Sequence, residues 1–191
     1  MLCCLQISPT QEKKTVREIE VIVPHEYYTC CFHLTRVRTK KYHGYWHDVN
    51  ERLLPGYVFI DCTDVEKVYE HLRKVPTLTK FLGFKEWYDD AQGMAGFLPL
   101  RPEEDELIRH LALGDGAAAP GLVEKSGVEL EPGKKVRVVS GPLMGLESQI
   151  VRIDRHRREV TIGVPLMGRI VEMKLGIIDV LASPDEAPSA R

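Results

Sequence analysis

Positively charged side chains are the residues of this chain best suited to binding, and they gather in two segments. One is the run Asp-Arg-His-Arg-Arg-Glu at 154–159. The other, from Arg36 to Trp46, interleaves Arg and Lys with Tyr and Trp. Guanidinium and ammonium groups pair with phosphate, and aromatic rings stack on bases. The two segments therefore predict binding of nucleic acid rather than catalysis. The candidate contacts are Arg36, Arg38, Lys41, Lys135, Arg137, Arg152, Arg155, His156, Arg157 and Arg158.

The distribution of charge along the chain supports a basic C-terminal part. The whole chain has 191 residues and a formal charge of −2. Residues 133–175 contain nine Lys or Arg and four acidic residues, a net charge of +5, so the remainder carries −7. A basic pole of this kind suits a phosphate-rich partner. Two alternatives stay open: a solvated face with both signs of charge, and an exposed hairpin whose aromatic rings pack on one another.

Residues that could support catalysis or metal binding lack a convincing pattern. His43 and His47 have the spacing of ligands on one helix face, but Gly44 and aromatic neighbours favour the cap of a hairpin. The five cysteines form no Cys-x-x-Cys pair and fall in predicted strands, which favours small buried hydrophobic roles in a reducing cytoplasm. We therefore expect no enzyme activity, no metal and no cofactor. Neither a membrane-spanning run nor a signal peptide is expected.

The basic run at 154–159 lies in a segment with the pattern of short strands. Val136 and Val138 alternate with Arg137, as in a half-buried strand, and Gly141-Pro142 predicts a turn. Residues 148–153 and 160–164 are two further predicted strands, joined by the basic run. The charged residues would therefore stand on a tight hairpin of a small β-structure.

The first half of the chain predicts the order strand, helix, strand, strand, helix, strand. The predicted strands are 2–7, 28–38, 54–62 and 77–84, and the helices follow capping signals at Ser8 and at Thr63. The first helix would bury Val16, Ile19, Ile22 and Val23, and the second Val65, Val68, Tyr69 and Leu72. A peripheral helix is predicted at 103–113. This order predicts a ferredoxin-like α/β sandwich, and so an α+β fold.

Two sets of residues resemble a known family. Val136-Arg137-Val138, Gly141-Pro142-Leu143 and Gly145 resemble a KOW module, the small five-stranded SH3-like β-barrel of NusG-type elongation factors and some ribosomal proteins; Leu166-Met167-Gly168-Arg169 resembles a later turn of that barrel. Leu54-Pro55-Gly56-Tyr57-Val58-Phe59-Ile60, Phe81-Leu82-Gly83 and Leu98-Pro99-Leu100 resemble the NusG N-terminal domain. The chain departs from the family in its first strand: the family usually opens on Trp-Tyr-Val, whereas this chain begins Met1-Leu2-Cys3-Cys4-Leu5.

The resemblance implies a layout and a set of contacts. We expect a NusG N-terminal domain at 1–113, a flexible linker at 114–131, a KOW β-barrel at 132–182 and a disordered tail at 183–191. Val58 and Ile60 would point to one face of the sheet and Tyr57 and Phe59 to the other, so one pair faces the helices and the other the open face. In NusG-type proteins this region docks on the clamp of RNA polymerase. The residues expected at that contact are Leu54, Pro55, Tyr57, Phe59 and Phe81. Tyr57 and Phe59 could instead belong to the core.

The resemblance implies a monomeric, cytoplasmic transcription elongation or antitermination factor, which binds polymerase through its first domain and nascent RNA, such as a hairpin, or another factor through its barrel. The basic turn at 154–158 resembles the LoaP-like paralogues. One alternative is a housekeeping NusG that couples polymerase to a termination factor or a ribosomal protein. Another is a ribosome-associated, RNA-binding KOW protein.

Overall fold

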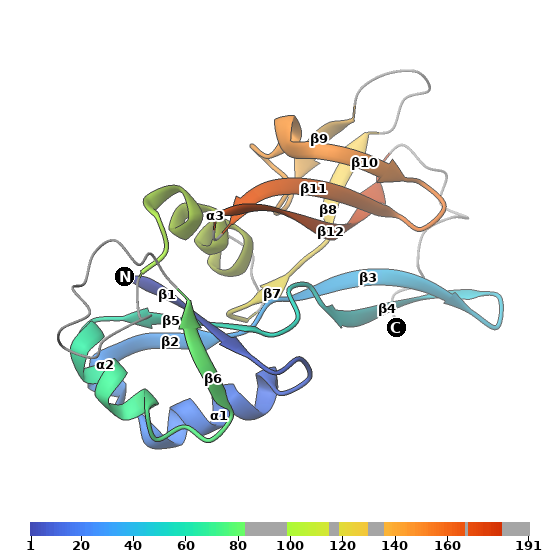
Figure 1. The fold of residues 1–191 in the computed structure, drawn as a ribbon. Coiled ribbons are helices and arrows are strands. Elements are labelled where there is room, and N and C mark those ends of the chain that lie inside the picture. The colour runs from blue at the N-terminus through green and yellow to red at the C-terminus, as the bar shows by residue number, and fades with distance from the viewer. Residues whose placement is uncertain (83–98, 115–118, 130–135, 167, 181–191) are drawn as a thin grey trace. The chain divides into compact units, whose positions relative to one another are not determined.

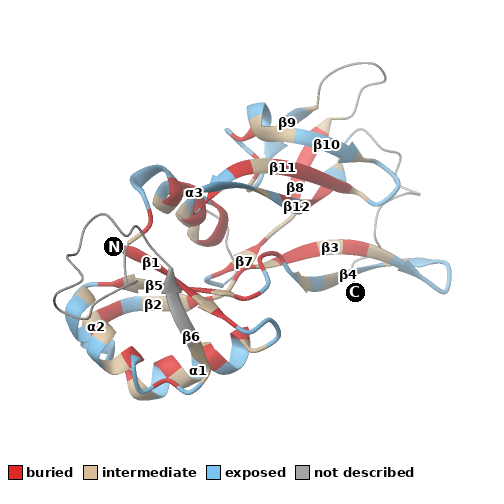
Figure 2. Cartoon of the chain, viewed as in Figure 1, coloured by how far each residue is buried: buried red, intermediate tan, exposed pale blue. Residues whose placement is uncertain are grey.

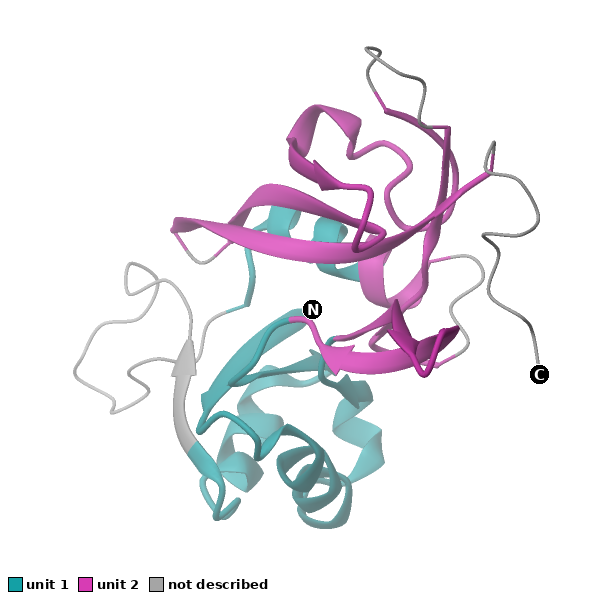
Figure 3. Cartoon of the chain, turned by 90° about the vertical axis from the view of Figure 1, so that its right-hand side faces the viewer, with its two compact units in different colours: residues 1–34, 54–109 teal, residues 35–53, 110–191 magenta. Residues whose placement is uncertain are grey.

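The computed structural model describes residues 1–82, 99–114, 119–129, 136–166 and 168–180, with the backbone alone at 79–82 (Figure 1). These residues form two compact units (Figure 3). Unit 1 comprises residues 1–34 and 54–109, and unit 2 comprises residues 35–53 and 110–191. Unit 2 thus takes a hairpin from the first half of the chain.

Unit 1 contains a four-stranded antiparallel sheet in the order β2-β5-β1-β6. Its strands are β1 (Leu2–Ile7), β2 (Tyr28–Phe32), β5 (Tyr57–Cys62) and β6 (Leu78–Leu82). Two helices, α1 (Glu12–Ile22) and α2 (Val65–Leu72), lie on one face of the sheet (Figure 1). The helix α3 (Pro102–Leu113) follows. This arrangement confirms the predicted ferredoxin-like sandwich.

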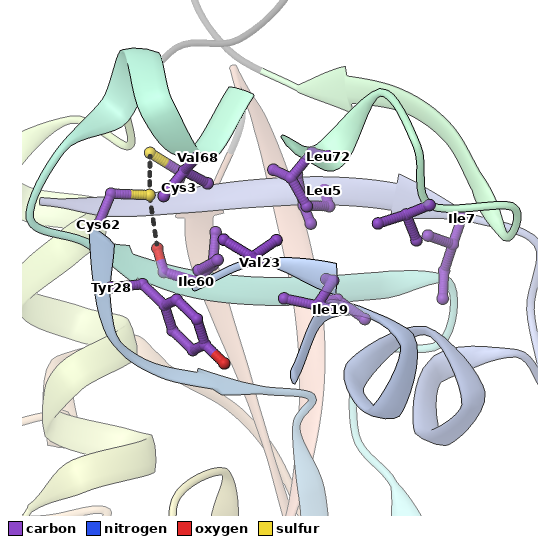
Figure 4. Packing of buried hydrophobic residues seen from close by; sticks show 12 residues of the cluster. Cys3, Leu5, Ile7, Ile19, Val23, Tyr28, Ile60, Cys62, Val68 and Leu72 are labelled. Atoms are coloured by element: carbon purple, nitrogen blue, oxygen red, sulfur yellow. Dashed lines mark hydrogen bonds between the residues drawn. The ribbon is translucent and has the colours of Figure 1, made fainter. Parts of the chain in front are cut away.

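The core of unit 1 lies between the sheet and the helices α1 and α2 (Figure 4). Leu5 and Ile60 from the sheet pack with Ile19 of α1 and with Val68 and Leu72 of α2. All five side chains are fully buried. Burial of such a side chain contributes about 1.5–3 kcal/mol, so this layer holds the helices on the sheet. The predicted helix stripes are therefore confirmed at their centres.

Both helices begin later than their predicted caps. Residues 8–11 form a turn, and α1 starts at Glu12, whose buried carboxylate accepts a 2.8 Å hydrogen bond from the Gly56 N–H. Helix α2 is capped by Asp64, which accepts a 3.0 Å hydrogen bond from the Lys67 N–H. The hydroxyl of Thr63 instead donates to the Glu26 carbonyl. The predicted caps at Ser8 and Thr63 were therefore wrong, because other hydrogen bonds engage these segments.

The single long strand predicted at 28–38 is wrong. The chain leaves strand geometry at His33 and Leu34 and continues in a different sheet as β3 (Thr35–Tyr42). Strand β2 pairs with β5, whereas β3 pairs with β4 (Tyr45–Arg52) and, at its first two residues, with β7 (Leu122–Val123). The break therefore separates the two units.

Unit 2 also contains a five-stranded sheet in the order β10-β11-β12-β8-β9. Its strands are β8 (Ser126–Glu129), β9 (Arg137–Ser140), β10 (Ile150–Asp154), β11 (Glu159–Leu166) and β12 (Arg169–Asp179). Val160, Ile162 and Val164 of β11 are fully buried, as are Met173 and Leu175 of β12. Figure 2 shows a buried stretch along β11. Gly141 and Gly145 have positive φ angles in the turn after β9. The three strands predicted between 136 and 164 are confirmed.

The segment expected as a linker contributes structure to unit 2. Strand β7 and strand β8 both fall within 114–131, and β8 joins β12 to β9 in the five-stranded sheet. The expected tail at 183–191 lies outside the described residues. Among the helices of the described part of the chain, none is long and apolar enough to cross a membrane.

Candidate nucleic-acid interface

The aromatic and basic segment at 36–46 forms the hairpin of β3 and β4. His43 and Gly44 make its two-residue turn, with φ angles of 49° and 88°. Turns with two positive φ angles match the twist of antiparallel strands, and glycine adopts such angles without strain. The pairing places Lys41 opposite Trp46 and Tyr42 opposite Tyr45. The prediction that this segment closes a hairpin is confirmed.

Arg36 and Arg38 lie in a network of ion pairs rather than in solvent. Glu51 accepts hydrogen bonds from Arg36 Nη2 at 3.1 Å and from Arg38 Nη1 at 3.2 Å, and it also pairs with Lys40. Glu159, at the start of β11, places Oε1 3.0 Å from Arg36 Nη2 and 3.1 Å from Arg38 Nε. Neither contact to Glu159 is aligned as a hydrogen bond, so this buried carboxylate acts mainly as a shared counter-charge.

The charge state of Glu51 follows from these neighbours. Burial alone would raise the pKa of its carboxyl group, but hydrogen bonds from Lys40, Arg38 and Arg36 lower the pKa to about 2. Glu51 therefore stays ionised at any physiological pH and keeps the three cations in place.

The same network ties the hairpin to the five-stranded sheet. Arg36 is only 6% exposed, and its Nη1 donates a 2.7 Å hydrogen bond to the Lys174 carbonyl of β12. A side chain at Gly176 would collide with the Val37 carbonyl, so β12 can approach β3 only with glycine at that position. The hairpin is thus part of the C-terminal unit in this structure.

The turn between β10 and β11 presents the second basic segment. Asp154 Oδ1 accepts a 2.9 Å hydrogen bond from the Arg157 N–H, and this bond lowers the pKa of the Asp154 carboxyl. The side chains of Arg155, His156 and Arg157 are exposed. The closed turn therefore holds three groups that can carry positive charge in contact with solvent.

Arg158 connects the turn to the hairpin. Its φ angle of 54° ends the turn, and its guanidinium carbon lies 4.1 Å from the centroid of the Trp46 ring. Lys41 Nζ lies 5.6 Å from the same centroid. Such cation–π contacts each contribute about 0.5–1 kcal/mol at exposed sites. The two predicted basic segments, more than a hundred residues apart in sequence, meet at this ring.

The other predicted nucleic-acid contacts are more scattered. Arg152 is exposed on β10, and exposed Arg137 on β9 pairs with Glu129 at 3.2 Å. Lys135 lies outside the described residues.

The described residues contain no group of three or more His, Cys, Asp or Glu that could hold a metal ion. The five cysteines form no disulfide; Cys3, Cys4 and Cys62 are buried, and Cys30 and Cys31 are half-buried.

Comparison with known proteins identifies the family of this chain. Residues 4–106 match the family described as transcription termination factor nusG, and residues 132–162 match the KOW motif. The chain belongs to the NusG family. A relative, the transcription termination/antitermination protein NusG of Thermus thermophilus, is 30% identical over 138 residues, which cover 70% of this chain and 68% of the relative.

Two further NusG proteins are similar to this chain, one in sequence and one in fold. The Staphylococcus aureus protein is 29% identical over 120 residues, which cover 62% of this chain and 58% of the relative. A solved structure of Thermotoga maritima NusG shares the fold, with a TM-score of 0.52, 22% identity and 92% coverage of both chains. The chain is therefore a transcription termination/antitermination factor of the NusG family.

The residues expected to contact polymerase occupy different environments. Pro55 is exposed and Tyr57 is half-buried, whereas Leu54 is buried. Phe59 is fully buried, and its ring stacks on Phe32 with the centroids 5.7 Å apart. The backbone of Phe81 pairs with Leu5 in the sheet, and its side chain lies outside the described part. Polymerase contact through these residues stays a prediction, with Pro55 and Tyr57 the accessible members.

Sequence reasoning missed the two carboxylates of the ion-pair network. The hairpin register could have indicated Glu51, because a two-residue turn at 43–44 puts it opposite Arg36. Glu159 had no such signal, since nothing local links position 159 to a strand that begins at Thr35. Contact with RNA through Arg36 and Arg38 also stays a prediction; their guanidinium groups have carboxylate partners here.

Proposed function

We propose that this NusG-family protein is a transcription elongation and antitermination factor with two binding surfaces. The N-terminal part binds RNA polymerase, and the basic turn of the KOW region binds nascent RNA. It acts in the cytoplasm as a monomer and resembles the specialised LoaP-like paralogues more than the housekeeping proteins. No catalytic step is involved.

The observation that carries the RNA proposal is the exposed turn at 154–158. Its cationic side chains stand on a tight turn, in a segment whose net charge is positive although the whole chain is slightly acidic. Neutralising phosphates with Lys and Arg releases counterions and provides affinity that is independent of sequence. The match to the NusG family over residues 4–106 favours this function over that of a ribosome-associated KOW protein.

The polymerase proposal rests on family membership. The N-terminal part would bridge the polymerase clamp, disfavour its opening and so reduce pausing and termination. Capture of a nascent RNA element by the basic turn would then recruit the factor to chosen transcripts. Each contact raises the effective concentration of the other partner, so two modest affinities suffice.

Salt-dependent RNA binding tests the proposal. We expect the full chain to bind an RNA hairpin at low salt with an affinity that falls steeply as salt rises. Arg155→Ala and Arg157→Ala should each lower the log–log salt slope by about 1 or less, because each removes at most one phosphate contact. Lys13→Ala, at an exposed position of α1, is the matched control and should leave the slope unchanged. An unchanged slope in both turn variants would overturn the RNA assignment.

A second candidate is the housekeeping function, in which the KOW region binds a termination factor or a ribosomal protein. Exposed apolar side chains favour this function: Val151 on β10 is 63% exposed and Ile170 on β12 is 69% exposed. A chain that binds no RNA at low salt, but binds such a protein through these residues, would have this function instead.

A further inference from the structure

The place where the hairpin meets the basic turn has a feature that the proposed function does not explain. Two cations from distant parts of the chain, Lys41 of β3 and Arg158 of the turn, lie against one aromatic ring, that of Trp46. Like charges repel, and the attraction of each cation to the ring offsets only part of this cost. The fold thus brings two positive charges together.

The ion-pair network, which the strand register places on the other face of the hairpin from Lys41 and Trp46, is also cationic. Arg36, Arg38 and Lys40 share two carboxylates, Glu51 and Glu159, so the five groups carry a net charge of +1. The buried Glu159 directly follows Arg158 in the chain. The ion pairs of Glu159 with Arg36 and Arg38 connect the hairpin to β11. They therefore also fix the backbone next to Arg158, whose side chain contacts Trp46.

We propose that the β3–β4 hairpin and the turn at 154–158 form one phosphate-binding site for RNA, in which Lys41 and Arg158 contact the backbone together. Trp46 and Glu159 are positioning residues: the ring orients Arg158, and the carboxylate holds the hairpin against β11. This inference rests on the proposed RNA function and adds that the hairpin belongs to the same site.

Physical reasons favour one site over two independent ones. Long basic side chains lose conformational entropy when they bind, and a site that holds them in advance binds more tightly. Two cations held at one ring create a potential that favours an anion.

The test uses the full chain with Trp87 replaced by Phe, which leaves Trp46 as the single tryptophan. The probe is an RNA duplex of arbitrary sequence at low salt, and both affinity and Trp46 fluorescence are measured. We expect RNA to change the fluorescence and to shield Trp46 from acrylamide. Lys41→Gln and Arg158→Gln should each weaken binding about five- to tenfold, as expected for a charge-assisted contact. Their effects should be non-additive, because both contact the same part of the backbone.

Substitutions of the positioning residues Trp46 and Glu159 should have different effects from those of Lys41 and Arg158. Trp46→Leu should weaken RNA binding without changing the salt slope, since no charge is lost, and Trp46→Phe should restore most of the affinity. Glu159→Gln should raise the acrylamide accessibility of Trp46 in the absence of RNA. A purely structural role for Trp46 would change stability without changing the affinity of the folded protein, and that result would overturn its assignment.

The outcomes separate this inference from the proposed function. If Arg155→Ala weakens RNA binding while Lys41→Gln and Trp46→Leu do not, the turn binds RNA alone and the joint site is wrong. If the unmodified chain binds no RNA at low salt, the proposed function itself fails. Equal binding of polyglutamate, with the same dependence on Trp46, would indicate an acidic protein partner and would also overturn the RNA assignment.

Discussion

Asp61, at the end of β5, shows how one carboxylate can hold several parts of unit 1. Arg109 of α3 donates to both of its oxygens, at 2.7 and 2.8 Å, and the N-terminal ammonium group lies 3.0 Å from Oδ1. The hydrogen bonds from Arg109, more than any other contact, lower the pKa of Asp61 to about 2. Charge-assisted bonds of this kind contribute more to stability than neutral ones.

Acid should therefore weaken unit 1 through Asp61. The folded pKa of about 2 lies below the ordinary value of 3.8, so the stabilisation is full above pH 3.8 and is lost as the pH falls towards 2. Asp61→Asn should lower the free energy of unfolding at pH 7 by about 1.5–3 kcal/mol and flatten its dependence between these values. Urea titrations across this range would measure both effects. Glu20→Gln, at an exposed position of α1, should change neither; an unaltered pH dependence in Asp61→Asn would contradict the assignment.

Tyr57 tests the polymerase surface at a single position. The ring is half-buried, next to Gly56, whose backbone is held by Glu12. We expect Tyr57→Ala to weaken binding to core polymerase in a pull-down by roughly tenfold, the size of effect of losing an interfacial aromatic side chain. Tyr57→Phe keeps the ring and should bind normally. If Tyr57→Ala instead melts the fold while binding per folded molecule is unchanged, Tyr57 is a core residue.

The hairpin of β3 and β4 shows how a turn sets the positions of charged groups. Its two-residue turn fixes the register, and the register places Glu51 opposite Arg36 and Trp46 opposite Lys41. A shift by one residue would turn every side chain to the other face and disperse the network. The site therefore depends on two residues that do not touch it, His43 and Gly44.

Substitution of Gly44 should expose this dependence. A Cβ at this position would meet no atom within 4 Å, so the cost of Gly44→Ala arises from its φ angle of 88° alone. We expect a loss of about 1 kcal/mol in the free energy of unfolding. Gly44→Asn should lose less, because asparagine tolerates left-handed geometry. A stability in the Ala variant equal to that of the original chain would show that the turn does not need glycine.

Local sequence patterns predicted the helices and strands of this chain well where the tertiary partners of a segment agreed with its own hydrophobic pattern. The strand at Leu2–Ile7, the buried Val68 and Leu72 of α2 and the three strands between 136 and 164 all follow from periodicity. The break at His33 could not be predicted, because the residues on both sides favour strands. Only their partners differ, β5 for one and β4 with β7 for the other, and partners are a property of the fold.

At the scale of the whole molecule, the chain alternates between its two units. It enters unit 2 at Thr35, returns to unit 1 at Leu54 and enters unit 2 again at His110. The hairpin thus contributes to a unit formed mainly by residues more than fifty positions later. The two basic segments of the candidate nucleic-acid site could be predicted from the sequence. Their contact at Trp46 could not, because it depends on the fold.

Removal of the C-terminal part should reveal which unit holds the hairpin. A fragment of residues 1–113 lacks Glu159, the Lys174 carbonyl and β7, so buried Arg36 would keep only Glu51 as a partner. We expect the amide protons of β3 to exchange much faster than in the full chain, while those of β1 and β5 stay protected. Hydrogen-exchange mass spectrometry measures both in one experiment. Equal protection of β3 in the fragment and the full chain would mean that the hairpin is stable without unit 2.

The late position of Glu159 has a consequence during synthesis. Arg36 leaves the ribosome well before its counter-charge, and at about 5–20 residues per second the interval lasts on the order of 10 s. A hairpin forms within microseconds, so β3 and β4 pair long before β11 exists. During this interval Arg36 and Arg38 have Glu51 but not Glu159, and the nascent hairpin carries excess positive charge beside ribosomal RNA. The rate of translation, rather than the rate of hairpin formation, then sets when the network around Arg36 becomes complete.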